Sequence, residues 1–273
     1  MKTEPVSITI VTSTLNCAKG LAATAASLRS QNWHATQWIV ADGGSTDDTI
    51  SVIHRNADVI GDWYSEPDRG IYDAWNKACR LIRGEWVMFL GAGDLFSQAT
   101  TLTSAAGYLT NIDPEIDFLY GNVVQTRGRQ VLYRYGEVDL LGWQLCRPAV
   151  PAHQGVFHRA RLFRSEAPFD DTYRIAGDTK LMLQHMHVAN TRYVDLDVAT
   201  MEAGGVSSHP ASALKVMREV LRLEAELGYR IPPVQRALYV ARSYSKALLS
   251  RLIGSAAVDS LIRTKQRLIG PNT

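Results

Sequence analysis

The chain has few cysteines, and no two of them lie close in sequence. Cys17, Cys79 and Cys146 form no C-x-x-C pair, which is the spacing of many zinc and redox sites. We therefore expect core or near-core thiols in a reducing compartment. No apolar run approaches the roughly 18 residues of a membrane span, and Met1–Pro5 leads into a strand-like run without an apolar leader. These absences predict a cytoplasmic protein.

Glycine is missing from the turn that follows the first strand-like run. Residues 6–13 are mostly β-branched, and Ser13–Asn16 then reads Ser-Thr-Leu-Asn. A loop that holds a triphosphate is normally rich in glycine and carries a basic residue. Its absence disfavours a nucleotidyltransferase.

Charge is nearly balanced over the whole chain but not along it. The net charge is +2, and residues 211–273 hold 11 Lys and Arg against 4 Asp and Glu. An acidic body with a basic end predicts attraction of that end to an anionic partner. We favour a phospholipid surface over nucleic acid.

The first half alternates between strand-like and helix-like segments. Apolar runs at 6–13, 38–41, 63–65 and 85–90 are separated by helical patterns at 18–31, 45–55 and 72–83. This order predicts a largely parallel sheet with helices on both faces. Residues 118–126 and 130–135 predict a hairpin. The region up to 210 is otherwise mixed, with a loop between Pro148 and Pro151, before residues 153–158.

The last part is helical and amphipathic. Leucines at 238, 248, 249 and 252 alternate with Arg236, Arg242, Lys246 and Arg251. Such a helix either packs on the body with its polar face in solvent or lies on an anionic membrane surface. The sequence leaves both interpretations open. We expect domains at 1–210, with halves at 1–110 and 111–210, and at 211–273.

Four polar motifs follow the predicted strands. They are Asp42-Gly-Gly-Ser-Thr-Asp47, Ser65-Glu-Pro-Asp-Arg-Gly-Ile-Tyr-Asp-Ala-Trp-Asn-Lys77, Phe89-Leu-Gly-Ala-Gly-Asp94, and His153-Gln154 followed by Ile175-Ala-Gly-Asp178. Ligands of α/β proteins bind at the carboxyl ends of strands. Over about residues 6–207 these motifs resemble family 2 of the glycosyltransferases, the inverting nucleotide-sugar enzymes of GT-A fold, and especially members that build bacterial exopolysaccharides such as colanic acid.

The resemblance implies a role for each motif. It implies a nucleotide-diphosphate sugar donor, with UDP favoured, and a polysaccharide or polyprenyl-linked acceptor at the inner face of the cell membrane. Asp178 matches the general base, and His153 and Gln154 match the acceptor side. The residues implied for nucleotide binding are Thr12, Asp42, Gly43, Ser45, Asp68, Gly70, Asp73 and Lys77. From their chemistry alone, the carboxylates also fit turns and helix caps.

The metal motif departs from the family pattern. The usual motif is Asp-x-Asp, whereas Asp94 follows Gly91, Ala92 and Gly93. A carboxylate suits Mg²⁺ or Mn²⁺, so we expect Asp94 to bind the metal with low affinity in the absence of nucleotide, with His209 as a further candidate ligand. The missing acidic partner also leaves open a catalytically silent sugar-nucleotide-binding subunit.

Overall fold

A computed structural model describes residues 6–144, 146–205, 209–254 and 257–258. Contacts divide the chain into two units, the first made of Met1–Val138 and Pro151–Glu202, the second of Asp139–Val150 and Ala203–Thr273. The boundaries expected at 110 and 210 stay predictions. Residues 206–208 and residues 259–273 of the predicted helical extension lie outside the described residues.

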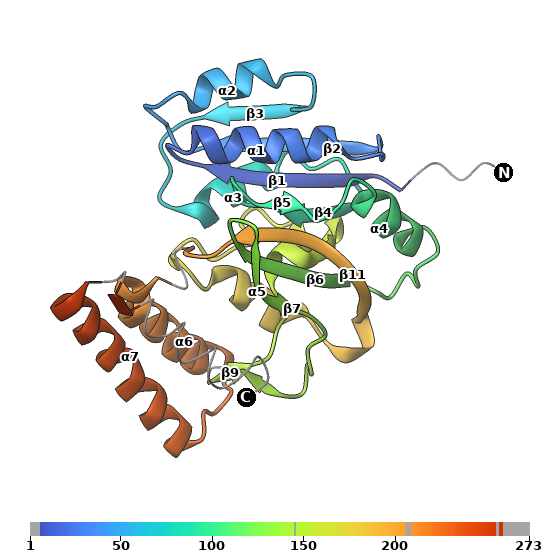
Figure 1. The fold of residues 1–273 in the computed structure, drawn as a ribbon. Helices are drawn as coiled ribbons and strands as arrows, with labels where there is room; N and C mark the ends of the chain where they lie inside the picture. The colour runs from blue at the N-terminus through green and yellow to red at the C-terminus, as the bar shows by residue number, and fades with distance from the viewer. Residues whose placement is uncertain (1–5, 145, 206–208, 255–256, 259–273) are drawn as a thin grey trace. The chain divides into compact units, whose positions relative to one another are not determined.

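The first four strands of the first unit are parallel. They are β1 (Ile8–Thr14), β2 (Thr36–Asp42), β3 (Asp62–Ser65) and β4 (Trp86–Phe89), linked by α1 (Ala18–Arg29), α2 (Thr49–Arg55) and α3 (Ile71–Cys79). They pair in the order β3-β2-β1-β4, as Figure 1 shows. The predicted alternation of strands and helices is confirmed.

The rest of the sheet is mixed. After β4 come β5 (Leu95–Phe96), α4 (Thr101–Leu109), β6 (Phe118–Arg127), β7 (Gln130–Tyr135), β10 (Val156–Arg159), α5 (Gly177–His185) and β11 (Thr191–Glu202). The order continues β4-β10-β6-β11-β5, and β7 pairs with β6, which confirms the predicted hairpin. Strand β10 is antiparallel to both neighbours. The sequence did not predict this strand, because four residues after two prolines carry too little periodicity to indicate one.

The two faces of the parallel strands are both covered. Ile8, Ile10 and Val40 share one core cluster with Leu21 and Leu28 of α1. Successive strand residues point to opposite faces. The alternate residues, such as Val11, Ile39 and Phe89, are also fully or almost fully buried, and α3 packs against β1 and β2. Burial on both faces explains why these strands are continuous apolar runs.

The second unit is mainly helical. It contains β8 (Trp143–Gln144), β9 (Arg147–Pro148), α6 (Ala213–Leu227) and α7 (Pro233–Ile253). Helix α6 ends at Gly228, whose φ of 72° is the left-handed conformation that glycine adopts readily. Short 3₁₀ helices in the chain are η1 (His153–Gly155), η2 (Ala160–Phe163), η3 (Val188–Asn190) and η4 (Pro210–Ser212). Within the described ranges, no helix has the length and apolar character to cross a bilayer.

Candidate active site

Polar loops meet at the carboxyl edge of the four parallel strands. In the strand register, Asp42 at the end of β2 lies opposite Thr14 of β1 on one side and Ser65 of β3 on the other. The N–H of Gly43 donates to the Thr14 carbonyl at 2.9 Å, and the N–H of Glu66 donates to the Asp42 carbonyl at 3.0 Å. The loops after β1, β2 and β3 therefore leave the sheet side by side.

Asp42 organises the loop that follows it. Its side chain is fully buried. Oδ2 accepts from the N–H groups of Gly44 at 3.1 Å and Ser45 at 2.9 Å and from the Ser65 hydroxyl at 2.6 Å, and Oδ1 accepts from the Ser45 hydroxyl at 2.5 Å. Contact with a base, which the resemblance implies for Asp42, stays a prediction that requires this buried side chain to become accessible.

Asp68 is the partly exposed carboxylate beside this loop. Its Oδ1 accepts from the N–H of Gly70 at 2.8 Å, and Gly70 has a φ of 128°, which a side chain would strain. A Cβ added to Gly43 would lie 2.5 Å from Asp68 Oδ2. The loops after β2 and β3 thus touch only because residue 43 has no side chain.

Asn16 ties the loop after β1 to the loop after β2. Its side-chain oxygen accepts from the N–H of Thr46 at 2.8 Å, and its own N–H donates to the Ser45 hydroxyl at 2.7 Å. Asn16 has a φ of 49°, a conformation that asparagine tolerates better than most residues. Sequence reasoning assigned it no role. Thr12, predicted to bind nucleotide, is fully buried and accepts from the Trp38 indole at 3.0 Å, so we leave it out of the pocket.

The loop after β4 holds Asp94. The N–H of Gly91 donates to Asp94 Oδ2 at 3.1 Å, and the Thr24 hydroxyl donates to the Asp94 carbonyl at 2.9 Å. Burial raises the pKa of Asp94 to about 6, although hydrogen bonds from Gly91 and Gln154 favour its charged form. The bond to Gln154 brings the predicted acceptor-side motif to the loop after β4.

Asp94 fits a divalent cation as a single protein ligand. Burial disfavours its negative charge, and a bound cation would relieve that cost. Within the part of the chain that the structure describes, no three His, Cys, Asp or Glu side chains form a metal-binding group. His209 lies in the second unit, where its Nδ1 accepts from the N–H of Ala211 at 3.3 Å. A metal at Asp94 would leave coordination positions for phosphate oxygens and water, and His209 as a further ligand stays a prediction.

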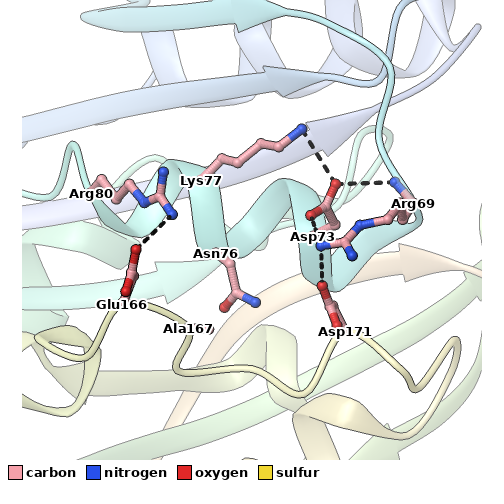
Figure 2. Close-up of a pocket in the computed structure, with 8 residues that line it drawn as sticks. All are labelled: Arg69, Asp73, Asn76, Lys77, Arg80, Glu166, Ala167 and Asp171. Carbon is pink, nitrogen blue, oxygen red and sulfur yellow. Dashed lines mark hydrogen bonds and ion pairs between the residues drawn. The ribbon is translucent and has the colours of Figure 1, made fainter.

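Asp73 joins the loop after β3 to helix α3, as Figure 2 shows. Its carboxylate is nearly buried and pairs with Arg69 at 2.9 Å and with Lys77 at 3.3 Å, and Lys77 also pairs with Glu66 at 2.9 Å. Burial alone would raise the pKa of Asp73, but the bonds from Arg69 and Lys77 lower it to about 2. Asp73 and Lys77, predicted to bind nucleotide, are engaged in holding the loop.

A shallow cleft of about 410 Å³ lies along this side of α3. It is lined by Arg69, Asp73, Asn76, Lys77, Arg80, Glu166, Ala167 and Asp171. Its charged residues pair with one another, including Arg69 with Asp171 at 2.5 Å. Because those charges are already matched within the protein, we do not assign the cleft to the donor.

The same side of α3 anchors the segment that leads to Asp178. The Asn76 side chain donates to the Phe169 carbonyl at 2.8 Å and accepts from the Phe169 N–H at 2.9 Å. Asp170 then pairs with Lys180 of α5 at 2.6 Å. These contacts bring α5 to α3 across about a hundred residues of sequence.

Asp178 lies in the first turn of α5, beside Tyr72 in the first turn of α3. Asp178 Oδ1 accepts from the N–H of Thr179 at 2.6 Å and lies 3.2 Å from the Tyr72 hydroxyl, which also lies 2.7 Å from the Ile175 carbonyl. A Cβ on Gly177 would be 2.8 Å from the Tyr72 ring. Burial, with the nearby charge of Asp178, raises the pKa of Tyr72 well above its ordinary value.

His153, predicted to face the acceptor, lies in an aromatic cluster. Its ring centroid is 5.2 Å from Phe89, 5.3 Å from Trp75 and 5.0 Å from His158. Burial lowers the pKa of His153 to about 3, so its ring is neutral at neutral pH. His153 is therefore part of the core, and the acceptor-side role of Gln154 stays a prediction.

Sequence reasoning missed Tyr72 and Asn76 as positioning residues. Both lie inside the motif Ser65–Lys77, and both are nearly buried. A polar side chain buried on a helix requires hydrogen-bond partners from another segment, but no pattern in the sequence identifies that segment.

Solved structures of low sequence identity share the fold. Staphylococcus aureus TarS 1-349 in complex with UDP has a TM-score of 0.59 at 18% identity, over 88% of this chain and 72% of that chain. The mannosyltransferase PcManGT from Pyrobaculum calidifontis, in complex with GDP-Man and Mn²⁺, has a TM-score of 0.62 at 17% identity, over 96% and 79%. The protein has the GT-A glycosyltransferase fold, as predicted.

The sequence comparisons define the family. The model described as glycosyl transferase family 2 matches residues 9–167. The PGL/p-HBAD biosynthesis glycosyltransferase of Mycobacterium tuberculosis (strain ATCC 25177 / H37Ra) is 31% identical over 228 residues, which cover 81% of this chain and 86% of that protein. The chain belongs to glycosyl transferase family 2. It is a transferase enzyme that uses a nucleotide sugar, which excludes the nucleotidyltransferase and silent-subunit alternatives.

Proposed function

We propose that the enzyme transfers a sugar from a UDP-sugar to a saccharide hydroxyl, with inversion at the anomeric carbon and Asp178 as the general base. The observation that carries the proposal is the contact between Asp178 and Tyr72. Tyr72 comes four residues after Asp68, so the carboxylate of α5 lies next to the loops at the sheet edge. Asp178 and the donor loops can then act on one bound substrate pair.

The proposed donor pocket is formed by the loops after β2, β3 and β4. Gly43, Ser45, Asp68 and Gly70 surround the nucleoside, and Asp42 holds the first of these loops in place. A bound Mg²⁺ or Mn²⁺ would neutralise charge on the leaving diphosphate, with Asp94 as its protein ligand. Mn²⁺ in the PcManGT complex supports this assignment.

The reaction is a single in-line displacement. The acceptor oxygen forms a bond to the anomeric carbon while its proton passes to the Asp178 carboxylate. The bond from the anomeric carbon to the diphosphate breaks, and its electron pair leaves with the nucleoside diphosphate. A positioned base typically contributes about 10² to 10⁴ to such a rate.

The acceptor is proposed to be a growing polysaccharide or a polyprenyl-linked saccharide. A lipid-linked acceptor would place the enzyme in the cytoplasm at the inner face of the membrane, where residues 211–273, with their positive balance, would meet anionic lipid. Synthesis of an exopolysaccharide is the process that we propose the enzyme serves.

Nucleoside-diphosphate release tests the proposal. The wild-type protein is incubated with a panel of UDP- and GDP-sugars, Mg²⁺ or Mn²⁺, and lipid and polysaccharide extracts. We expect release that depends on both acceptor and UDP-sugar. Release only with GDP-sugars would contradict the proposal that the donor is a UDP-sugar. A retained anomeric configuration in the product would contradict the single displacement.

A further inference from the structure

Helix α7 carries exposed apolar side chains on one face, near both of its ends. Val234, Leu238, Leu248, Leu249 and Leu252 are between 42% and 72% exposed. They follow Val234 by 4, 14, 15 and 18 residues, which are close to whole turns of a helix with about 3.6 residues per turn. These five side chains form one stripe, which we call the α7 stripe.

The packed side of α7 lies opposite the α7 stripe. Ser243, the buried residue of this helix, follows Val234 by 9 residues, which is about two and a half turns. Arg236, on the same side, pairs with Glu224 of α6 at 3.3 Å. The leucines are therefore not the side chains with which α7 packs against α6. Five large apolar side chains exposed on one face of a helix indicate an interaction surface.

Positive charge borders the α7 stripe on both sides. Arg242 and Lys246 lie along one edge and Arg251 along the other, by the same helical count. The helix contains no acidic residue. Long basic side chains beside an apolar face place their stems along apolar surface and their charges at a phosphate layer.

We propose that the α7 stripe docks on an anionic lipid bilayer, entering the interface while Arg242 and Arg251 meet lipid phosphates. A second copy of this chain fits the stripe less well. A two-fold contact uses the same surface on both copies, so it would place the basic residues of one α7 against those of the other, with no acidic residue on either helix. The inference rests on the membrane placement in the proposed function and is independent of the donor and base assignments.

Vesicle co-sedimentation of the full chain tests this inference. The vesicles are phosphatidylcholine with or without phosphatidylglycerol. The stripe variant is Leu238→Ser, Leu248→Ser and Leu252→Ser. The control variant, Val131→Ser, Leu141→Ser and Val188→Ser, removes three exposed apolar side chains from other parts of the chain. A charge variant carries Arg242→Gln and Arg251→Gln.

We expect the wild type and the control variant to bind vesicles that contain phosphatidylglycerol. Binding of the stripe variant should fall at least about tenfold, because three leucines no longer enter the interface. The charge variant should lose its preference for phosphatidylglycerol, as should the wild type at high salt. UDP release in detergent should be equal in the wild type and the stripe variant, which separates this inference from the proposed function.

Equal sedimentation of the stripe variant and the wild type would overturn the inference. So would a wild type that fails to bind vesicles. If light scattering then shows a wild-type dimer and a monomeric stripe variant, the α7 stripe is a contact between copies of the chain.

Discussion

Tyr72 is the side chain most directly placed to hold the proposed base. Its hydroxyl lies within hydrogen-bond distance of Asp178 Oδ1 and of the Ile175 carbonyl. It can donate to the carboxylate while Asp178 is charged and turn to the carbonyl once Asp178 has taken a proton. Tyr72 is therefore a positioning residue for Asp178.

Removing this hydroxyl should lower turnover without weakening donor binding. For Tyr72→Phe we expect kcat to fall by roughly tenfold or more, as for a lost hydrogen bond to a charged group, with the donor KM nearly unchanged. The matched control is Tyr64→Phe, because the Tyr64 hydroxyl donates to the Ala74 carbonyl at 2.6 Å on the same helix and touches no catalytic group. An equal loss in both variants would show that Tyr72 acts only through the stability of α3.

The buried histidines predict how stability depends on pH. Burial lowers the pKa of His153 to about 3 and that of His158 well below its ordinary value. The unfolded chain takes up these protons near pH 6.5, whereas the folded protein does not. Each histidine therefore contributes stability that is present above about pH 6.5 and is lost as pH falls toward its folded pKa. Protonation of Asp94, with a raised pKa of about 6, opposes part of this loss.

Replacing His153 by Phe should reduce this sensitivity to acid. The ring of His153 stacks on Phe89 at 5.2 Å, so an aromatic replacement keeps the packing. Between pH 6 and pH 4.5, the free energy of unfolding of the wild type should fall more steeply than that of His153→Phe, by up to about 1.4 kcal/mol per pH unit. Urea unfolding at several pH values measures the slopes, and equal slopes would contradict a neutral buried His153.

At the scale of elements, Gly43 determines how closely the loops after β2 and β3 approach. A Cβ there would lie 2.5 Å from Asp68 Oδ2, so Gly43→Ala should push the carboxylate out of the donor pocket and raise the donor KM by about tenfold, by analogy with the loss of one charged contact. Stability should change little, because a partly exposed side chain can move. Steady-state kinetics and thermal unfolding measure both effects.

Gly107 provides the matched substitution in a helix. It lies on the exposed side of α4, and no atom is within 4 Å of an added Cβ. Gly107→Ala should stabilise the protein by roughly 0.5–1 kcal/mol, through the helix propensity of alanine, and leave the donor KM unchanged. If Gly43→Ala leaves KM unchanged as well, Asp68 does not contact the donor.

The parallel half of the fold was predictable from sequence, and the mixed half only in part. Residues 6–13 are buried on both faces, so an apolar run identifies β1. The hairpin of β6 and β7 was marked by Arg127-Gly128-Arg129. Strand β10 was not predictable, because its position between β4 and β6 depends on pairing with distant strands, and its four residues have no pattern of their own.

The candidate site shows the same limit. Glycines and carboxylates after the strands indicated where a ligand binds. The hydrogen-bond and ion-pair partners of Asp42 and Asp73 within the protein could be seen only in the folded structure. Both carboxylates are buried or nearly buried and accept several hydrogen bonds. These bonds hold the loops in place. The sequence carries no signal that separates such a supporting carboxylate from a ligand-binding one.

In the whole molecule, we expect the two units to have different tasks. The first unit carries the donor loops, Asp94 and Asp178, and the second carries the α7 stripe. Truncation before α7 should therefore abolish vesicle binding and leave the donor site intact. Vesicle co-sedimentation and UDP binding, both measured on a chain ending at residue 231, check this division. Loss of UDP binding would show that the second unit also supports the donor site.

We propose that Asp178 removes the acceptor proton but is not needed for the site to bind the donor. The most direct measurement compares Asp178→Asn with the wild type in acceptor-dependent UDP release and in calorimetric binding of UDP with Mn²⁺. We expect turnover to fall by about 10² to 10⁴, while the Kd for UDP stays within about twofold. Turnover near that of the wild type, or UDP binding lost together with turnover, would contradict this proposal.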